Sequence, residues 1–588
     1  MHYKAPVRDM MFLATEWLGM DRISSLPDFE DVDADLFEAV LEEAGKFCST
    51  EVLAINQVGD EVGAVHKDGN VTTPPGFKEV YQKFIENGWT GIDSNPDHGG
   101  QGLPKLLQVQ IDEMLGATNL AFKLYSELSH GAYYLLNAVA DEATKAKYLP
   151  KMVEGVWSGT MCLTEPHCGT DLGLLTTKAT PNGDGSYTIN GSKIFITSGD
   201  HDLTENILHL VIARVEGAPA GTRGISLFLV PKFLVSDDGS IGERNAVNTA
   251  SIEHKMGIRG SATCALNFDD ATGFMIGEEN RGLAAMFKMM NIERLTVGMQ
   301  GLGFSEMAYQ NALAYAQDRR QSKAPAPRPD PDKAADPIVY QPDIKRQLLM
   351  MRSQIEGCRA LAMVAAHNID TMEKTGDEAA TNGVALLTPV VKAFFTDLGM
   401  ECTMAGVQIY GGHGYIVEHG MEQLVRDCRI TPIYEGTNEV QALDLVSRKL
   451  SGQVGEYASG LLNEKKRVLA DLVNDDSMSD IAGPALAGLE RLIEATDWIQ
   501  AKLGEDDAAV RGAATKYLRL FALSFIGCLW AEIVASIKDR SGSFYDTKRK
   551  VARFYVEQVL PETASLRDVV IEGSDAISDF DVADFGEA

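Results

Sequence analysis

The chain has 588 residues, and its composition of 45% hydrophobic and 23% charged residues excludes disordered, collagen-like and low-complexity proteins. The 53 Lys and Arg residues stand against 84 Asp and Glu residues, so the formal net charge is −31. A surface of this sign repels nucleic-acid phosphates and anionic lipid, which disfavours nucleic-acid binding and polybasic membrane binding.

The cysteines and the apolar stretches favour a protein of a reducing compartment. The 8 scattered cysteines never form a Cys-x-x-Cys pair, and the 11 histidines show no metal-ligand spacing, so we expect no metal. No secretory signal is visible, and the longest apolar stretch, residues 520–531, is too short to span a bilayer. We expect this stretch to be a buried helix, with membrane-surface contact as the alternative. The expected location is the bacterial cytoplasm or an organelle matrix, without stable membrane insertion.

The spacing of apolar residues predicts a mainly α fold with an inserted β domain. Helical spacing gives way to short β-branched runs separated by Gly, Asn and Asp, and then returns. Six prolines within residues 321–342 predict a loop, because proline lacks the N–H that a helix needs. The predicted domains are an N-terminal arm (1–34), an N-terminal helical domain (35–159), a middle β domain (160–281), a second helical domain (282–451) and a C-terminal helical extension (452–588).

The most informative stretch begins Gln408-Ile-Tyr-Gly-Gly-His-Gly-Tyr and continues to Tyr434-Glu-Gly-Thr-Asn-Glu-Val. Its first glycine pair, Gly411 and Gly412, predicts the end of a helix and close backbone approach to a ligand. Thr437 is a predicted N-cap of a helix over 438–450. Glu435 therefore precedes a helix N-terminus, which favours its ionised form, whereas burial against an apolar ligand opposes it. Such a carboxylate suits a general base, but the pattern alone favours an ordinary capping-turn glutamate.

This stretch resembles the acyl-CoA dehydrogenase family, whose catalytic carboxylate lies in a Tyr-Glu-Gly-Thr motif. Three further segments resemble family signatures in family order: residues 91–102 of the N-terminal helical domain, residues 161–171 with Thr-Glu-Pro, and residues 190–199 with the second flavin strand. The resemblance extends over about residues 35–450. It implies a helical N-domain, a β-barrel-like middle domain and a helical-bundle C-domain, here followed by an extra C-terminal helical domain.

The resemblance implies a reaction as well as a fold. Glu435 would remove a proton from the acyl α-carbon while the β-carbon gives a hydride to flavin N5, which yields a trans-2-enoyl-CoA. The thioester oxygen would accept hydrogen bonds from a flavin ribityl hydroxyl and from the Glu435 N–H. Some branches of the family carry the base at the position of Glu293 instead. We favour Glu435, because those branches have generally lost the Tyr-Glu-Gly-Thr glutamate, and we interpret Glu293 as an ion-pair or helix-surface residue.

The resemblance also assigns ligand contacts, with FAD as the cofactor. Arg319 would reach the flavin pyrophosphate of the neighbouring subunit, and residues 408–412 would receive that flavin's adenosine end. Without the resemblance, the strand residues among these would be unremarkable. The expected flavin contacts are Leu163, Thr164, Thr170, Phe195, Thr197, Arg319, Gln408, Gly411, Gly412, Thr437 and Glu439, and the expected acyl-CoA contacts are Thr170, Asn291, Arg294, Glu435 and Gly436.

Substrate and partners are expected on the same basis. The opening Tyr3-Lys-Ala-Pro-Val-Arg-Asp-Met and the length resemble a long bacterial branch that acts on 3-(methylthio)propanoyl-CoA, in dimethylsulfoniopropionate breakdown. Medium- or long-chain fatty acyl-CoA of β-oxidation stays open. We expect a homodimer that passes electrons to an electron-transfer flavoprotein. The alternatives are an oxygen-using acyl-CoA oxidase and a flavin-retaining acyl-CoA-binding scaffold without turnover.

Overall fold

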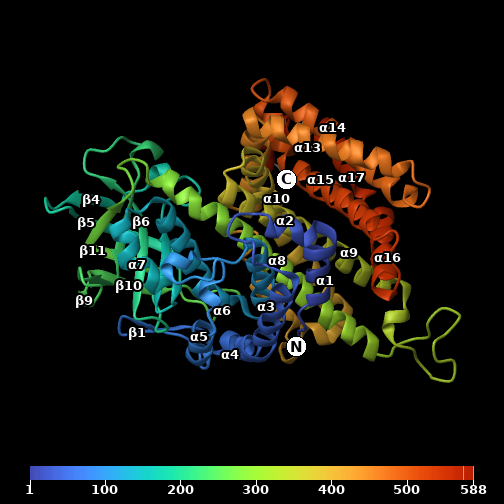
Figure 1. Ribbon diagram of the computed structural model, residues 1–588, viewed down its shortest axis with the longest axis horizontal. Helices are drawn as coiled ribbons and strands as arrows, with labels where there is room; N and C mark the ends of the chain where they lie inside the picture. Colours follow the sequence, from blue (N-terminus) through green and yellow to red (C-terminus); the bar gives the residue numbers. More distant parts are fainter. Residues whose placement is uncertain (574, 587–588) are drawn as a thin grey trace. The chain divides into compact units, whose positions relative to one another are not determined.

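Figure 1 shows the computed structural model, which describes residues 1–573 and 575–586. The chain divides into two compact units. The first consists of residues 1–45, 105–117 and 297–588, and the second of residues 46–104 and 118–296. Two long helices, α6 (Lys105–Val139) and α8 (Gly282–Asp318), contribute residues to both units. The backbone of α6 breaks at Asn119, whose side-chain oxygen accepts a hydrogen bond from the Phe122 N–H and so begins the second half of that helix.

The second unit contains a closed barrel, which confirms the predicted β domain. Strand β7 pairs with both β6 and β11, so the order β11-β5-β4-β6-β7 returns to β11, while β10 and β3 extend the ring at β11 and β6. Strands β6 and β7 are almost entirely buried, as their Val, Ile and Leu content requires. The strands are β3 (Trp157–Cys162), β4 (Lys178–Pro181), β5 (Ser186–Thr197), β6 (Asn206–Val215), β7 (Ser226–Pro231), β10 (Val247–Ile252) and β11 (Thr263–Ile276).

Helices and short turns complete the second unit. The aromatic rings of Phe77, Tyr81 and Phe84 on α5 pack edge-on against Phe122 of α6, with ring centroids 5.8–6.4 Å apart. The remaining elements are η2 (Cys48–Val52), η3 (Leu53–Ile55), α4 (Asn56–Val62), β1 (Val65–Lys67), β2 (Asn70–Thr72), α5 (Phe77–Glu86), η4 (Trp89–Gly91), η5 (Pro96–His98), α7 (Glu142–Val153), η6 (Leu172–Leu174), η7 (Thr222–Gly224), β8 (Phe233–Val235) and β9 (Ile241–Arg244).

The first unit is helical, and glycines of α8 allow its helices to pack closely. A Cβ on Gly301 would lie 2.4 Å from the Phe395 carbonyl oxygen of α10, so no larger residue fits there. The elements before the C-terminal extension are α1 (Val7–Met11), η1 (Phe12–Gly19), α2 (Met20–Ser24), α3 (Ala34–Phe47), η8 (Ile338–Tyr340), α9 (Pro342–Thr375), α10 (Glu378–Tyr410), η9 (Gly411–Tyr415), η10 (Val417–His419), α11 (Met421–Cys428), α12 (Asn438–Asp444) and η11 (Leu445–Lys449).

The C-terminal extension is helical, as predicted, and α15 forms its core. Residues 520–531 lie inside α15 and are all buried, which confirms the expected buried helix. Residues Glu378–Tyr415 and Asp507–Ser536 form helices that are long and apolar enough to span a bilayer, but 83% of each apolar window is buried inside the protein. The helices are α13 (Gly452–Val473), α14 (Ser479–Lys502), α15 (Asp507–Ser536), α16 (Ser543–Gln558), α17 (Glu562–Glu572) and α18 (Asp575–Ser578), followed by η12 (Val582–Gly586).

Candidate active site

Two segments of the barrel that were predicted to bind a cofactor lie side by side. The chain leaves β3 at Cys162 and runs past Leu163 and Thr164 toward the Glu165 loop. The Thr164 carbonyl oxygen accepts a hydrogen bond of 2.9 Å from the Ile194 N–H of β5, and the Leu163 carbonyl accepts one of 2.9 Å from Lys193 Nζ. Thr164 and Thr197 are partly exposed, whereas Leu163 is buried and Thr170 is exposed on the following loop.

A bulge in β5 turns Phe195 toward solvent. The pairing of β5 with β11 passes from Lys193–Leu266 to Ile196–Cys264, so two residues of β5 face one of β11. Phe195 adopts a φ of +58°, which a bulky residue rarely does, and 59% of it is exposed. An aromatic side chain held in this way presents a flat apolar face to a ring-shaped ligand.

The Glu165 carboxylate braces the loop that follows Thr164. Oε1 accepts hydrogen bonds from Lys193 Nζ at 2.9 Å and Thr177 Oγ1 at 2.6 Å, and Oε2 accepts one from the Thr176 N–H at 2.7 Å. Burial alone would raise the pKa of Glu165, but Lys193 and these donors outweigh it and lower the pKa to about 2. The sequence showed Glu165 as part of a motif but gave no sign of this role.

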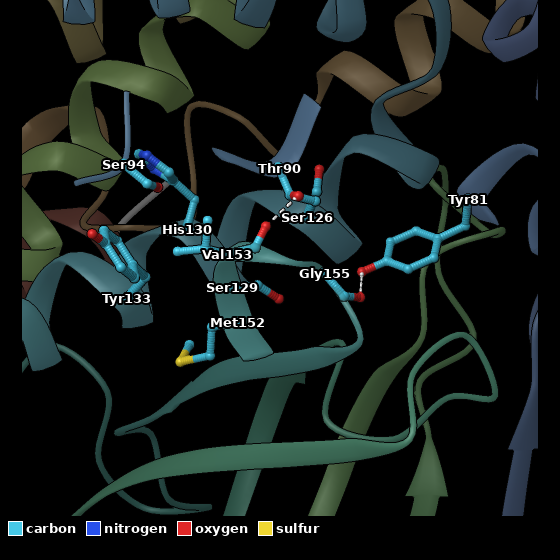
Figure 2. Close-up of a pocket in the computed structure, with 10 residues that line it drawn as sticks. All are labelled: Tyr81, Thr90, Ser94, Ser126, Ser129, His130, Tyr133, Met152, Val153 and Gly155. Carbon is cyan, nitrogen blue, oxygen red and sulfur yellow. Dashed lines mark hydrogen bonds between the residues drawn. The ribbon is translucent and has the colours of Figure 1, made fainter. Parts of the chain in front are cut away.

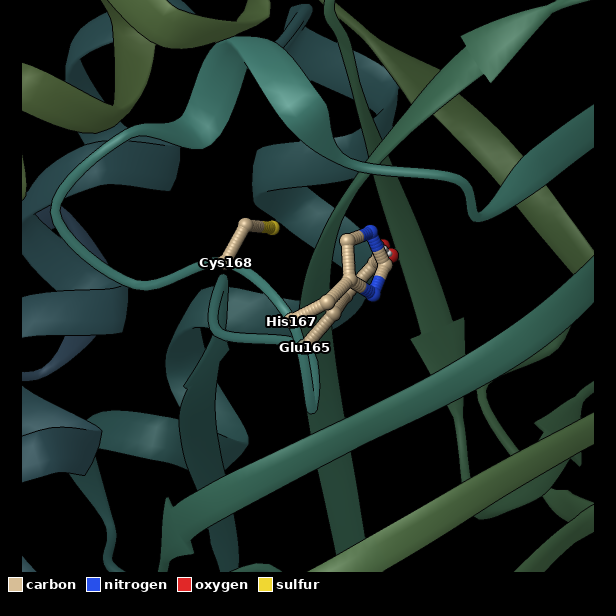
Figure 3. A group of neighbouring side chains, drawn as sticks. All are labelled: Glu165, His167 and Cys168. Atoms are coloured by element: carbon tan, nitrogen blue, oxygen red, sulfur yellow. Dashed lines mark ion pairs between the residues drawn. The ribbon is translucent and has the colours of Figure 1, made fainter.

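Glu165, His167 and Cys168 also form a group whose side chains could hold a metal ion, because their ligand atoms lie within 4.8 Å of one another (Figure 3). However, the Glu165 oxygens are already occupied by the donors named above, and the Lys193 ammonium would lie beside any bound cation. His167 Nε2 lies 3.0 Å from the Leu174 carbonyl oxygen and 3.8 Å from Glu165 Oε2. Glu165 and His167 therefore act as hydrogen-bonding residues that hold this loop.

The predicted substrate residues of α8 differ in exposure. Asn291 is exposed, whereas Arg294 is buried, with its guanidinium carbon 6.0 Å from the centre of the Phe287 ring. Glu293 is 2% exposed, and a Cβ on Gly131 of α6 would lie 1.9 Å from its Oε1. The interpretation of Glu293 as a helix-surface residue is therefore wrong, because the packing of α8 against α6 covers it.

In the first unit, Glu435 lies on a tightly held turn before α12. Thr437 Oγ1 accepts a hydrogen bond of 3.3 Å from the Val440 N–H, which confirms the predicted N-cap, although α12 ends at Asp444 and continues as η11. Glu435 has a φ of +56° and is half-buried, and Gly436 has a φ of +85°. Gln441 Nε2 donates to the Glu435 carbonyl at 3.1 Å and to the Gly436 carbonyl at 3.3 Å. A positive φ is uncommon for a non-glycine residue and occurs in tight turns and at functional sites.

Gly411 ends α10, as predicted, and the exposed segment after it lies next to the end of α8. The Tyr315 ring of α8 stacks on Tyr410 with centroids 4.2 Å apart, and its hydroxyl lies 2.8 Å from His413 Nδ1. Arg319, one turn after Tyr315, is exposed, as are Gln408, Gly411 and Gly412. The structure therefore brings these residues to one face of the first unit, with their polar groups open to solvent.

The predicted residues thus form two groups. Residues 163–197 and 291–294 belong to the second unit, and Arg319, residues 408–412 and residues 435–439 belong to the first. A small pocket in the second unit is lined by none of the predicted residues, and its lining includes Ser126, His130 and Tyr133 of α6 (Figure 2). Its volume of about 10 Å³ suits about one water molecule, so it cannot hold an acyl chain.

Comparison with known proteins finds family models that cover both groups of predicted residues. Four family models match the chain: acyl-CoA dehydrogenase N-terminal domain over residues 37–156, middle domain over 160–271 and C-terminal domain over 280–450, and acetyl-CoA dehydrogenase C-terminal like over 461–581. The predicted cofactor and substrate residues fall within the middle and C-terminal matches.

Individual relatives agree with these matches. The chain is 38% identical to 3-methylmercaptopropionyl-CoA dehydrogenase of Ruegeria pomeroyi, over 98% of this chain and 99% of that protein. It is 34% identical to a butyryl-CoA dehydrogenase of Syntrophomonas wolfei, over 95% of each. A solved acyl-CoA dehydrogenase complexed with FAD from Bacillus anthracis shares the fold, with a TM-score of 0.75 and 21% identity over 94% of this chain and 90% of that one.

Proposed function

The chain belongs to the acyl-CoA dehydrogenase family of FAD-dependent oxidoreductases, and we propose that it oxidises an acyl-CoA thioester to a trans-2-enoyl-CoA with Glu435 as the base. The observation that carries this proposal is the conformation of Glu435. A glutamate held at a φ of +56° by Gln441, at the start of α12, has a fixed direction that a simple capping residue does not need.

The barrel residues fit a flavin. Phe195 offers an exposed aromatic face, and Thr164 and Thr197 lie nearby on segments joined by the Thr164–Ile194 hydrogen bond. A loop and a strand joined in this way provide polar groups and a stacking surface at the same edge of the barrel. We therefore propose Leu163, Thr164, Thr170, Phe195 and Thr197 as contacts of the bound flavin.

In the proposed reaction, the Glu435 carboxylate takes the proton from the acyl α-carbon. The electron pair of that C–H bond becomes the new C=C bond, and the β-carbon loses its hydrogen with the bonding pair. When bound, FAD supplies the acceptor for this hydride. The positive end of α12 favours the ionised form of Glu435 before the proton arrives. Arg294, Asn291 and Thr170 are the proposed contacts of the CoA portion.

We propose 3-(methylthio)propanoyl-CoA as the substrate, supported by the 38% identity to the Ruegeria pomeroyi enzyme over nearly the whole of both chains. The 34% identity to a butyryl-CoA dehydrogenase supports a short fatty acyl-CoA as the second candidate. Anaerobic titration of the FAD-loaded protein with the thioether substrate and with butanoyl- to hexadecanoyl-CoA tests both. Fastest flavin bleaching by the thioether is expected. Preference for long chains would contradict this substrate, and a lack of bleaching with every ligand would favour the scaffold without turnover.

We propose that the protein is a homodimer of the bacterial cytoplasm, and the exposed polar segment of the first unit supports the dimer. Arg319, Gln408, Gly411 and Gly412 all face solvent on adjacent segments, where a second subunit's flavin could bring its pyrophosphate and adenosine end. We propose an electron-transfer flavoprotein as the electron acceptor. Rapid reoxidation of the reduced protein by air would instead favour the oxidase.

A further inference from the structure

Asn438 is buried three residues after Glu435, and its side chain hydrogen-bonds to residues of α10. Its Oδ1 accepts a hydrogen bond of 2.9 Å from Lys392 Nζ, and its Nδ2 donates to the Ala393 carbonyl at 3.1 Å and to Asp397 Oδ1 at 2.7 Å. An ammonium can only donate and a carbonyl can only accept, so these partners fix the orientation of the amide. The side chain therefore connects the Glu435 turn to two adjacent turns of α10.

The partners of Asn438 on α10 are themselves held in place. Lys392 and Thr396 are both 0% exposed, and Asn438 is 7% exposed. Thr396 Oγ1 lies 3.0 Å from Asn438 Nδ2 and also donates to the Lys392 carbonyl at 2.8 Å. Polar groups buried to this degree need their hydrogen bonds, so loss of one partner leaves the others without compensation from water.

The backbone of Asn438 closes the turn that carries Glu435. Its N–H donates to the Pro432 carbonyl at 3.0 Å, so residues 432–438 form one closed loop. Gln441 holds the Glu435 and Gly436 carbonyls from the other side. A glutamate leaves the left-handed region readily when its loop is free, because that conformation is strained for a residue with a Cβ. The loop therefore needs a rigid attachment, and the Asn438 side chain provides it.

We infer that Asn438, held by Lys392, is a positioning residue that sets the direction of Glu435. This inference rests on the proposed role of Glu435 as the base. Asn438 acts through the turn, since its amide is occupied by α10. A misdirected base lowers the rate of proton removal, and displacements near 1 Å cost on the order of 100-fold in rate. Binding of acyl-CoA should change much less than the rate.

The test compares three variants of the FAD-loaded protein in anaerobic single-turnover bleaching. Asn438→Leu keeps the volume and removes the hydrogen bonds, and we expect it to slow bleaching about 100-fold while the Kd of the enoyl-CoA product stays within about threefold. Asn311→Leu is the matched control: Asn311 is 1% exposed and binds the His2 backbone. It should lose stability but keep its bleaching rate. A rate within about threefold of the parent protein in Asn438→Leu would overturn the inference.

A double variant separates positioning from stability. In Lys392→Met/Asn438→Leu, apolar side chains replace both members of the hydrogen-bonded pair. Compared with Asn438→Leu alone, this change no longer leaves the buried Lys392 ammonium without Asn438, so it can restore stability. We expect the melting temperature to recover and the bleaching rate to stay low, because the directional bonds are still missing. Recovery of rate together with melting temperature would show a merely structural role and refute the inference. If Asn438→Leu does not fold, the double variant still gives this readout.

The proposed function can fail separately. Glu435→Gln, measured in parallel, reports on the base alone. If Glu435→Gln bleaches normally, the proposed base is wrong. If Glu435→Gln is inactive and Asn438→Leu is fully active, only the positioning inference is wrong.

Discussion

Removal of Arg359 should destabilise the first unit more than any surface ion pair does. Arg359 is 2% exposed and bonds Glu113 at 2.5 and 2.9 Å, Glu306 at 2.8 Å and Asp9 at 2.5 Å. Arg359→Met removes the cation that bonds Glu113 and Glu306, while Asp9 keeps its ion pair with Lys548. Breaking a buried ion pair from one side costs about 3–5 kcal/mol. We expect a melting temperature lower by about 5–10 °C, taking about 2 °C per kcal/mol for a unit of this size.

The pH dependence of this loss has a defined sign. Burial raises the pKa of Glu113, and Arg359 opposes that rise. Without Arg359 the folded-state pKa of Glu113 rises further above its unfolded value, so the folded variant binds protons more tightly and gains stability as pH falls. The difference from the parent protein should therefore shrink from pH 8 to pH 5. It is measured by thermal unfolding across this range.

The control for Arg359→Met is Arg553→Met. This substitution removes an exposed ion pair within α16, in which Arg553 lies 2.7 Å from Glu557. Exposed pairs of this kind contribute about 0.3–0.5 kcal/mol, so the expected change in melting temperature is within about 1 °C. The reasoning would be refuted by an equal, small effect of both substitutions, or by a loss for Arg359→Met that grows as pH falls.

Three further predictions concern the barrel and the cofactor. Burial lowers the pKa of His209 to about 3, so below about pH 6.5 only the unfolded state binds a proton there. The free energy of unfolding therefore falls by about 1.4 kcal/mol per pH unit toward acid. His209→Asn should reduce this slope in unfolding measured from about pH 6.5 to about pH 4.5, and an unchanged slope would contradict the prediction. Phe195→Ala should lower the flavin-to-protein ratio after gel filtration, whereas Phe274→Ala, also on the barrel surface, should not. Arg319→Ala should weaken flavin retention in the same assay, and full retention would argue against its pyrophosphate contact.

The fold class was predictable because the period of the apolar pattern changes where the architecture changes. Short β-branched runs separated by Gly, Asn and Asp identified β5, β6, β7 and β11, and the proline run identified a loop. The packing role of the glycines in α8 was not predictable from the apolar pattern. Gly301 is required by the Phe395 backbone of another helix, and contacts between distant segments leave no periodic signal.

Candidate residues were predictable one by one, but their surroundings were not. The motif named Glu435 and Phe195, yet their positive φ angles depend on a closed turn and on a bulge set by the register of β5 against β11. Glu165 accepts hydrogen bonds from two separate segments, at Thr176–Thr177 and at Lys193, and Asn438 bonds to Lys392 of α10, which lies 46 residues earlier in the sequence. The helix-surface interpretation of Glu293 was wrong because burial by α6 depends on tertiary packing.

The most direct test of the central proposal is anaerobic flavin bleaching by acyl-CoA in Glu435→Gln beside Glu293→Gln. The two substitutions remove the same charge from the two candidate bases at nearly unchanged volume. We predict that Glu435→Gln retains FAD and binds acyl-CoA but bleaches at less than about one thousandth of the parent rate, at the scale of a lost general base. Glu293→Gln should keep most of its activity. Substantial bleaching in Glu435→Gln, or loss of bleaching only in Glu293→Gln, would contradict the assignment.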